Sequence, residues 1–182
     1  MVFHRKLRRT TAIVLLLPAL AGSPARAGDD NVLPDGIANA TFDGTEYGVV
    51  SLSDGTWEGA PWVAGGAARP RVGLARDFIR YGDVDGDGDD EALVIVWQSS
   101  GGSGTFNYIA LVDQSDGDWR NVATTALGDR VKVSDAAIGP DGVTVDVIEH
   151  DEDDPACCPT RATTRRYDAN LDEFNETDHE NR

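Results

Sequence analysis

The chain is poor in cysteine, histidine and basic residues, and each shortage excludes a class of protein. The 2 cysteines are adjacent, so no disulfide bond can link distant segments of one chain. Histidines number 3, and neither a zinc-binding His-x-x-x-His pair nor a dinucleotide-binding glycine fingerprint occurs. Lysine and arginine total 16 against 32 acidic residues, so the chain is expected to repel nucleic acid and anionic membranes.

Hydrolytic chemistry has little support in the sequence. A serine-histidine-aspartate triad would have to use His150, because His179 lies in an acidic C-terminal stretch, and nothing near His150 supports a triad. A carboxylate pair for glycoside cleavage can be drawn in many ways among 32 acidic residues, so no single pair is informative. A non-enzymatic role is therefore favoured.

Residues 1–27 have the form of a cleavable export signal. Basic residues precede an apolar run over residues 11–22, and a small-x-small cleavage site ends at Ala27. The run is too short to span a bilayer, and the arginine pair at residues 8–9 matches a twin-arginine signal poorly, which favours the general secretory route. Ser23 stands where a bacterial lipoprotein carries its lipidated cysteine, so no membrane anchor is expected. The sequence predicts a soluble periplasmic or secreted bacterial protein.

Removal of residues 1–27 would leave a strongly acidic domain. This segment holds 5 of the 16 basic residues and none of the 32 acidic ones, so the formal net charge falls from −16 to −21. Such an excess favours a cation as a partner. Residues 28–168 are long enough for a single β-rich domain. Residues 169–182 are rich in Asp, Glu and Asn and are expected to form a flexible tail.

Short apolar segments separated by turn residues predict an all-β or mainly β domain, either one antiparallel sheet or a sandwich. The clearest hairpin has alternating valines over residues 143–147, after a turn at residues 139–142. Residues 57–71 are rich in proline and glycine and predict an irregular connection. Further strands are expected over residues 46–53, 56–58, 92–97, 106–113, 120–125, 131–138 and 161–167.

One loop concentrates acidic residues at the spacing of a calcium site. Residues 82–91 alternate acidic and small residues, and Gly88 lies where such a loop must turn sharply. Ca²⁺ takes about six to eight oxygen ligands, and carboxylates at alternate positions of a curled loop can point to one centre. The predicted calcium ligands are Asp83, Asp85, Asp87, Asp89 and Glu91.

The loop differs from an EF-hand. Counted from Asp83, position 12 is Val94, where an EF-hand needs a bidentate glutamate. The loop resembles instead the Asp-x-Asp-x-Asp-Gly-x-x-Asp/Glu loops of FG-GAP and related β-propeller repeats, which implies a calcium site. The motif occurs once, so the propeller architecture is not implied. The alternative is an acidic, solvated turn, but the five predicted ligands, crowded within nine residues, would repel one another without a cation, which favours calcium.

A glycine-rich stretch over residues 99–105 invites comparison with phosphate-binding loops. It lacks the lysine of a P-loop, precedes a predicted strand and does not contain the Gly-x-Ser-x-Gly elbow of hydrolases. A flexible hairpin connection is expected, with a ligand-contacting role close to the calcium loop as the alternative.

Cys157 and Cys158 are predicted to form a vicinal disulfide in an oxidising compartment. A bond between neighbours closes a strained ring, because trans-linked Cα atoms lie about 3.8 Å apart, below the usual disulfide range, and strain makes such a bond easier to reduce. The alternatives are buried free thiols, a bridge between two chains, or a soft-metal site with His150 as a third ligand.

Several short motifs, taken in order, resemble a family of uncharacterised bacterial exported proteins and lipoproteins. The resemblance covers most of residues 38–167; it implies an envelope or secreted location and no particular activity. The motifs are Asn39-Ala40-Thr41, Gly65-Gly66-Ala67-Ala68-Arg69-Pro70, Gly82-Asp83-Val84-Asp85-Gly86-Asp87-Gly88, Ser100-Gly101-Gly102-Ser103-Gly104-Thr105-Phe106, Leu127-Gly128-Asp129-Arg130-Val131 and Ala156-Cys157-Cys158-Pro159-Thr160.

Two functions from different classes remain. The first is an exported, non-enzymatic calcium-binding module of the cell envelope, whose protein or glycan partner the sequence does not identify. The second is a thiol redox or soft-metal-handling periplasmic protein that uses Cys157 and Cys158.

Overall fold

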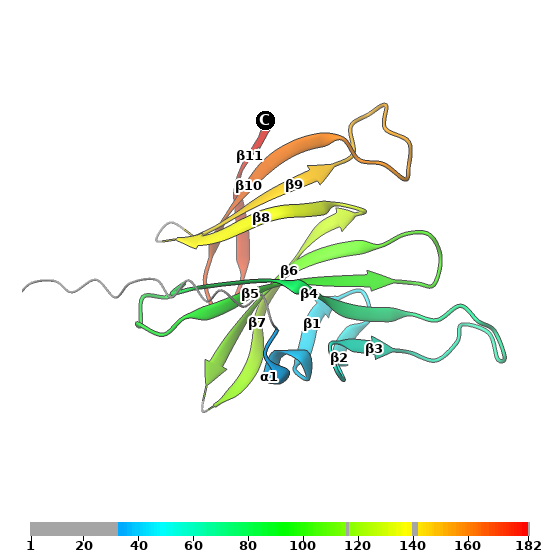
Figure 1. The fold of residues 1–182 in the computed structure, drawn as a ribbon, viewed down its shortest axis with the longest axis horizontal. Helices are drawn as coiled ribbons and strands as arrows, with labels where there is room; N and C mark the ends of the chain where they lie inside the picture. Colours follow the sequence, from blue (N-terminus) through cyan, green and yellow to red (C-terminus); the bar gives the residue numbers. More distant parts are fainter. Residues whose placement is uncertain (1–32, 116, 140–141, 182) are drawn as a thin grey trace, which may run out of the picture.

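The computed structural model describes residues 33–115, 117–139 and 142–181, and it confirms a mainly β fold built from antiparallel sheets. Figure 1 shows two sheets stacked on each other, with a short helix and a hairpin below them. The elements are α1 (Asp35–Ala38), β1 (Thr41–Thr45), β2 (Gly48–Ser51), β3 (Thr56–Glu58), β4 (Arg71–Gly82), β5 (Glu91–Ser99), β6 (Phe106–Ser115), β7 (Asp118–Asp129), β8 (Lys132–Gly139), β9 (Gly142–Glu149), β10 (Arg161–Ala169) and β11 (Phe174–Asn181).

The larger sheet has five antiparallel strands in the order β3-β4-β5-β6-β7. Its centre is β5, where every residue from 91 to 96 is buried. Ala92, Val94 and Val96 belong to one apolar cluster, whereas Leu93 and Ile95 belong to another. A strand covered on both faces needs apolar residues at consecutive positions, which explains why this segment does not alternate between apolar and polar side chains.

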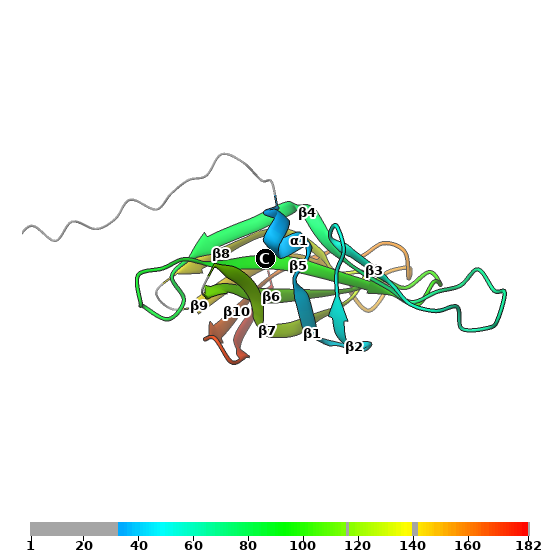
Figure 2. The ribbon, with the colours of Figure 1, turned by 90° about the horizontal axis from the view of Figure 1, so that it is seen from below.

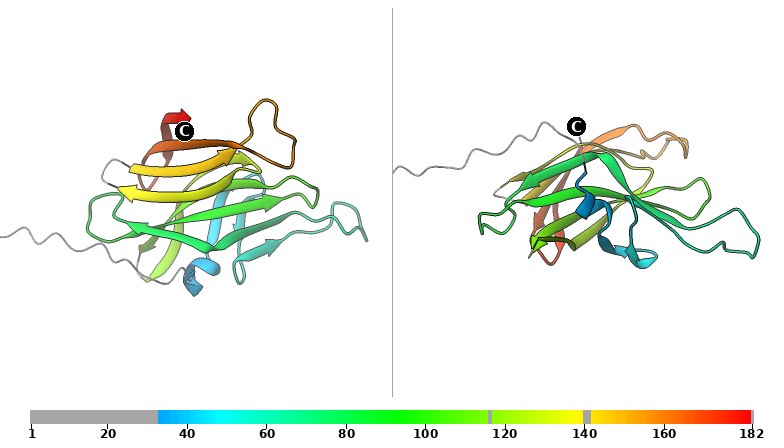
Figure 3. Two further views of the ribbon diagram at one scale, coloured as in Figure 1. Left: turned by 45° about the horizontal axis from the view of Figure 1, so that its top comes forward. Right: turned by 60° about the horizontal axis from the view of Figure 1, so that its bottom comes forward.

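The two faces of the five-stranded sheet have different covers. On one face, α1 and the β1–β2 hairpin supply Ile37, Phe42 and Val50, which are almost fully buried. On the other face lies a four-stranded sheet in the order β11-β10-β9-β8, which supplies Val145 and Tyr167. Figure 2 shows α1, β1 and β2 on the near side, and Figure 3 shows β8, β9 and β10 over the opposite face. Within the described residues the architecture is thus a sandwich with an extra layer.

The structure corrects the expectation of a flexible C-terminal tail over residues 169–182. Residues 174–181 form β11, which pairs with β10 over its length. Phe174 packs edge-on against Tyr167 with ring centroids 5.8 Å apart, and Arg166 lies 2.8 Å from Asp178. The acidic composition suggested a solvated chain, but the cationic side chain on β10 and the apolar anchor at Phe174 hold the strand in place.

A buried ion cluster ties this last strand to the second sheet. Glu149 is 5% exposed and Arg165 is 9% exposed, and their side chains form a hydrogen-bonded ion pair. The carboxylate of Glu149 also accepts a hydrogen bond from Thr163 (3.0 Å) and lies 2.8 Å from Nε2 of His179 on β11. Burial alone would raise the pKa of Glu149, but hydrogen bonds from Arg165, His179 and Thr163 outweigh it and lower that pKa to about 2.

Several strands predicted from the sequence are confirmed. The structure adds which strands pair and in which register, information that the local sequence pattern does not contain. The predicted hairpin around residues 139–142 joins β8 and β9, with Ile138 opposite Val143. Within the irregular connection predicted over residues 57–71, residues 59–70 contain neither helix nor strand, whereas the residues at its two ends belong to β3 and β4. No helix among the described residues is long and apolar enough to cross a membrane.

Candidate functional site

The acidic loop connects the end of β4 to the start of β5, where Gly82 pairs with Glu91. Its backbone turns sharply at Gly86 and Gly88, whose φ angles are 80° and 99°. Side chains other than glycine rarely adopt such angles, so these two glycines allow the loop to close within a few residues. The sequence prediction of a sharp turn at Gly88 is therefore confirmed.

The loop is wound around the carboxylate of Asp83. The backbone N–H of Gly86 donates to its Oδ1 (2.6 Å) and that of Gly88 donates to its Oδ2 (3.1 Å). The N–H of Asp87 donates to Oδ1 of Asp85 (3.1 Å), which adds a further tight turn. These bonds fix the first two acidic side chains of the motif against the backbone that follows them.

Three of the five predicted ligands come together. Asp83, Asp85 and Glu91 each offer a carboxylate oxygen, and these oxygens lie within 4.8 Å of one another. Asp87 and Asp89, the other two predicted ligands, lie outside this cluster. The oxygen Oδ1 of Asp87 instead accepts a hydrogen bond from the N–H of Asp89 (2.8 Å), so that side chain caps the end of the loop.

Glu91 is the unusual member of the cluster because its side chain is buried. The residue is 2% exposed, and its Oε2 accepts a hydrogen bond from the N–H of Val84 (2.7 Å). Burial raises the pKa of Glu91, and the nearby carboxylates Asp85, Asp113 and Asp87 raise it further, while the Val84 N–H acts in the opposite direction. The site therefore has an excess of negative charge around an acid that water cannot solvate.

Sequence reasoning missed Asp113. This residue lies on β6 and acts electrostatically on Glu91, because Ala92 of β5 pairs with Val112 of β6 and the neighbouring positions come side by side. Both strands were predicted from the sequence, but the closeness of Asp113 to Glu91 depends on the register between them, and the local sequence pattern does not give that register.

The cluster fits a hard divalent cation such as Ca²⁺ by its donor chemistry. All its ligand atoms are carboxylate oxygens, the donors that calcium prefers. Calcium–oxygen distances are about 2.3–2.6 Å, so two ligands of one ion lie at most about 5 Å apart. The separations within the cluster satisfy that limit. Asp83, Asp85 and Glu91 would hold the ion, with loop carbonyls and water completing its shell.

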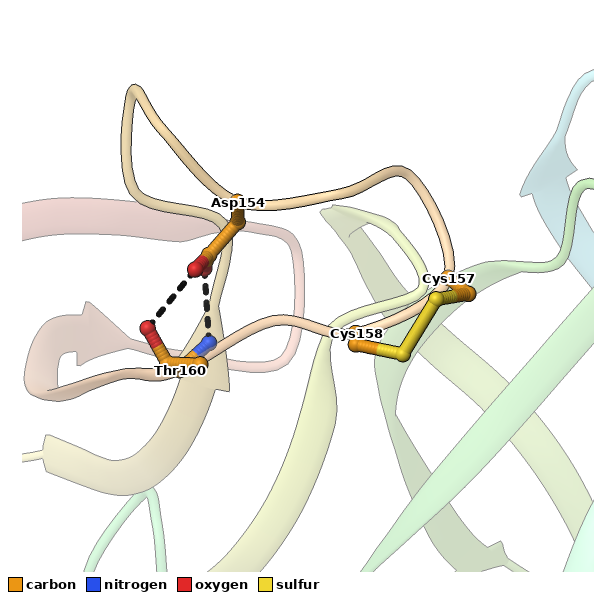
Figure 4. The surroundings of a disulfide bond; sticks show 4 residues. All are labelled: Asp154, Cys157, Cys158 and Thr160. Atoms are coloured by element: carbon orange, nitrogen blue, oxygen red, sulfur yellow. Dashed lines mark hydrogen bonds between the residues drawn. A yellow bond between two sulfur atoms is a disulfide. The ribbon is translucent and has the colours of Figure 1, made fainter.

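The second predicted site lies in the loop between β9 and β10. The Sγ atoms of Cys157 and Cys158 are joined in a vicinal disulfide, and both residues are exposed (Figure 4). Of the four arrangements considered for the two cysteines, the structure therefore contains the vicinal disulfide within one chain. Among the described residues, His150 and the two cysteines form no cluster that could hold a metal ion.

The loop that carries the disulfide is anchored by Asp154. Its carboxylate accepts hydrogen bonds from the N–H and Oγ1 of Thr160, both at 2.8 Å (Figure 4). It also accepts a hydrogen bond from the N–H of Asp151 (2.9 Å). These backbone and side-chain donors, together with nearby His150, lower the pKa of Asp154. The N–H of Cys158 also donates to the carbonyl of Pro155 (2.9 Å). The disulfide is therefore presented by a folded turn.

The glycine-rich segment is a hairpin connection, as expected, but it does not lie near the acidic loop. It follows β5, whereas the acidic loop precedes β5, so the nine residues of that strand separate them. The expected closeness of the two loops is wrong, because antiparallel strands place successive connections at opposite ends of the sheet.

The prediction of an export signal concerns residues 1–27, which lie outside the described residues. The resemblance to bacterial exported proteins and lipoproteins likewise stays a prediction. No family model, curated protein or solved structure matches the chain.

Proposed function

We propose that the protein is an exported, non-enzymatic Ca²⁺-binding module of the bacterial cell envelope, in which the ion fixes the connection between β4 and β5. The observation that carries this proposal is the buried carboxylate of Glu91, gathered with those of Asp83 and Asp85. An acidic turn that served only solubility would keep all its carboxylates in water, where their repulsion is weak.

Electrostatics favours a cation at this place. The buried carboxylate of Glu91 lies beside the exposed carboxylates of Asp83 and Asp85, and like charges next to a poorly solvated acid either raise its pKa or favour a bound cation. A bound divalent ion would reverse the balance around Glu91 and hold its side chain ionised. The export signal predicted from the sequence is consistent with this proposal, since extracellular modules often use calcium sites with dissociation constants of about 0.1–1 mM.

Calcium is expected to stabilise the folded protein. At a free ion concentration one hundred times the dissociation constant, the gain in unfolding free energy is about 2.7 kcal/mol. The replacement Asp85→Asn should abolish this gain, because it removes a charged ligand from the cluster. Thermal unfolding in Ca²⁺, in Mg²⁺ and in EDTA at low salt measures the effect.

The loop contains its own control. Asp89→Asn makes the same chemical change to a carboxylate outside the cluster, so it should leave most of the calcium-dependent shift intact. A melting temperature indifferent to calcium would refute the proposal. Equal losses in Asp85→Asn and Asp89→Asn would show a general response to acidic charge in place of a site.

A second candidate function, thiol–disulfide redox, is favoured by the exposure of the only cysteine pair in the chain. The mature protein should carry no free thiol as isolated, and mild reduction should raise its mass by two hydrogens per chain and expose two thiols to alkylation. Mass spectrometry with and without reductant measures both. Two titratable thiols before reduction, or a reductant-sensitive dimer as the main species, would contradict this function.

A further inference from the structure

Four of the sequence motifs gather at one end of the fold, opposite the acidic loop (Figure 1). The hairpin segment after β5 contacts the segment before β4: Nε1 of Trp62 donates to the carbonyl of Ser100 (2.7 Å), and a Cβ at Gly101 would lie 2.8 Å from the backbone nitrogen of Arg69. Motifs that are distant in the chain thus pack directly on one another.

The same hairpin segment is joined to the turn between β7 and β8. The N–H of Arg130 donates to the carbonyl of Thr105 (2.7 Å), and the N–H of Thr105 donates to Oδ1 of Asp129 (3.1 Å). The guanidinium of Arg130 also donates to the carbonyl of Ser103 (3.1 Å). These bonds make a continuous wall from three motifs.

The disulfide loop lies opposite this wall, and an open hollow of about 560 Å³ lies between the two. Cys157 contributes to its lining directly, so one sulfur-bearing residue of the disulfide faces a space large enough for a small molecule. The lining residues are Ser103, Thr105, Arg130, Lys132, Ala156 and Cys157.

The charge of the hollow differs in sign from that of the chain. Arg130 and Lys132 carry positive charge and no lining residue carries a carboxylate, although the protein has 32 acidic and 16 basic residues. Asp129 pairs with Arg130 at 2.5 Å and offsets part of its charge, whereas Lys132 adds a second cation. The two cations of the lining attract a small anion at short range, whereas the acidic residues 151–154 of the disulfide loop and the net charge of the whole molecule repel it.

We propose that the hollow binds a low-molecular-weight anionic thiol, which exchanges with the Cys157–Cys158 disulfide. This inference rests on the second candidate function and adds the class of its substrate. The cationic side chains have two effects on the reaction: they attract the anionic thiol and they stabilise the thiolates that form beside Cys157.

The exchange balances in two steps. The incoming thiolate attacks Sγ of Cys157, the bond to Sγ of Cys158 breaks, and Cys158 leaves as a thiolate that takes a proton. A second thiolate then attacks the outer sulfur of the mixed disulfide, releases Cys157 as a thiolate, and forms the small-molecule disulfide. In total, the two small thiols lose two electrons and two protons, and the protein disulfide takes up these electrons and protons to become a dithiol.

Three thiols of similar size and different charge test the proposal: 2-mercaptoethanesulfonate, 2-mercaptoethanol and cysteamine. Rates of reduction, corrected for the thiolate fraction and intrinsic reactivity of each thiol, are followed by alkylation and mass spectrometry. At low ionic strength the anionic thiol should react about 3- to 10-fold faster than the neutral one, and about 1 M salt should remove the difference. The net charge of the chain alone predicts the opposite order.

Matched variants locate the effect. Lys132→Gln should lower the preference for the anionic thiol, and Lys132→Arg should restore it. Arg120→Gln makes the same charge change near the start of β7, about 30 Å along the strand from Arg130, and should leave the preference unchanged. Equal losses in Lys132→Gln and Arg120→Gln, or reduction without preference for the anion, would overturn the binding role of the hollow. Failure of all three thiols to reduce the bond would overturn the redox function itself.

Discussion

Replacement of Glu149 by alanine is expected to lower the unfolding free energy by about 3–5 kcal/mol, the usual cost of breaking a buried ion pair. The substitution leaves Arg165, which is 9% exposed, with its charge unpaired inside the protein. It also removes the acceptor of Thr163, one of the two carboxylate partners of His179 and a partner of Arg161. Chemical denaturation at neutral pH measures the loss.

The same cluster predicts an acid-sensitive contribution to stability. The pKa of Glu149 falls from 4.5 to about 2 on folding, so its contribution is complete above about pH 5 and is lost as the pH falls toward 2. The shift corresponds to about 3 kcal/mol. Wild-type protein should therefore lose about that much more stability over this range than Glu149→Gln, in which the group cannot titrate.

Glu152→Ala provides the control for both measurements. Glu152 lies in the exposed loop before the disulfide, and its replacement should change stability by less than about 0.5 kcal/mol. A loss in Glu149→Ala no larger than that in Glu152→Ala would mean that the cluster contributes nothing to the fold.

The second large effect is expected from Phe42→Ala, with a loss of about 3–5 kcal/mol in unfolding free energy. Phe42 is fully buried in β1 and belongs to the cluster that contains Val94 and Val96. Removal of the ring would leave a cavity between the β1–β2 hairpin and the five-stranded sheet. Urea unfolding, with the midpoint and the slope fitted separately, measures the loss.

Val49→Ala in the partner strand is the matched control. Val49 is 68% exposed, so shortening its side chain should change stability by less than about 0.5 kcal/mol. If Phe42→Ala were equally mild, the hairpin would not cover the sheet as described. A changed slope with an unchanged midpoint would instead indicate an altered unfolded state.

The sequence allowed the central strands to be predicted because their local pattern is strong. The consecutive apolar residues of β5 and the alternating valines of β9 identify strands without further information. By contrast, β11 was missed because its polar segment is held by cross-strand partners on β10, such as Arg166. The irregular pairing of β4 with β5 between Leu74 and Ile79 likewise has no local signal in the sequence.

The candidate sites show the same division between local and non-local information. Spacing alone located the acidic loop, but the turns of the backbone decide that Asp83 and Asp85 join Glu91 while Asp89 does not. Asp113 and the cationic hollow depend on which strands pair and in which register. Such contacts follow from the assembled sheet, and no single stretch of residues contains them.

The acidic strand β11 also affects how copies of the chain meet. It is the outermost strand of its sheet, and an outermost strand offers unpaired backbone groups to which a strand of another molecule can add. The exposed carboxylates of Glu176, Asp178 and Glu180 lie on this strand, and they outnumber Arg166 and His179, the basic residues that pair with them. The remaining negative charge at the edge opposes the addition of a second acidic strand, so the composition that suggested a loose tail also works against edge-to-edge aggregation.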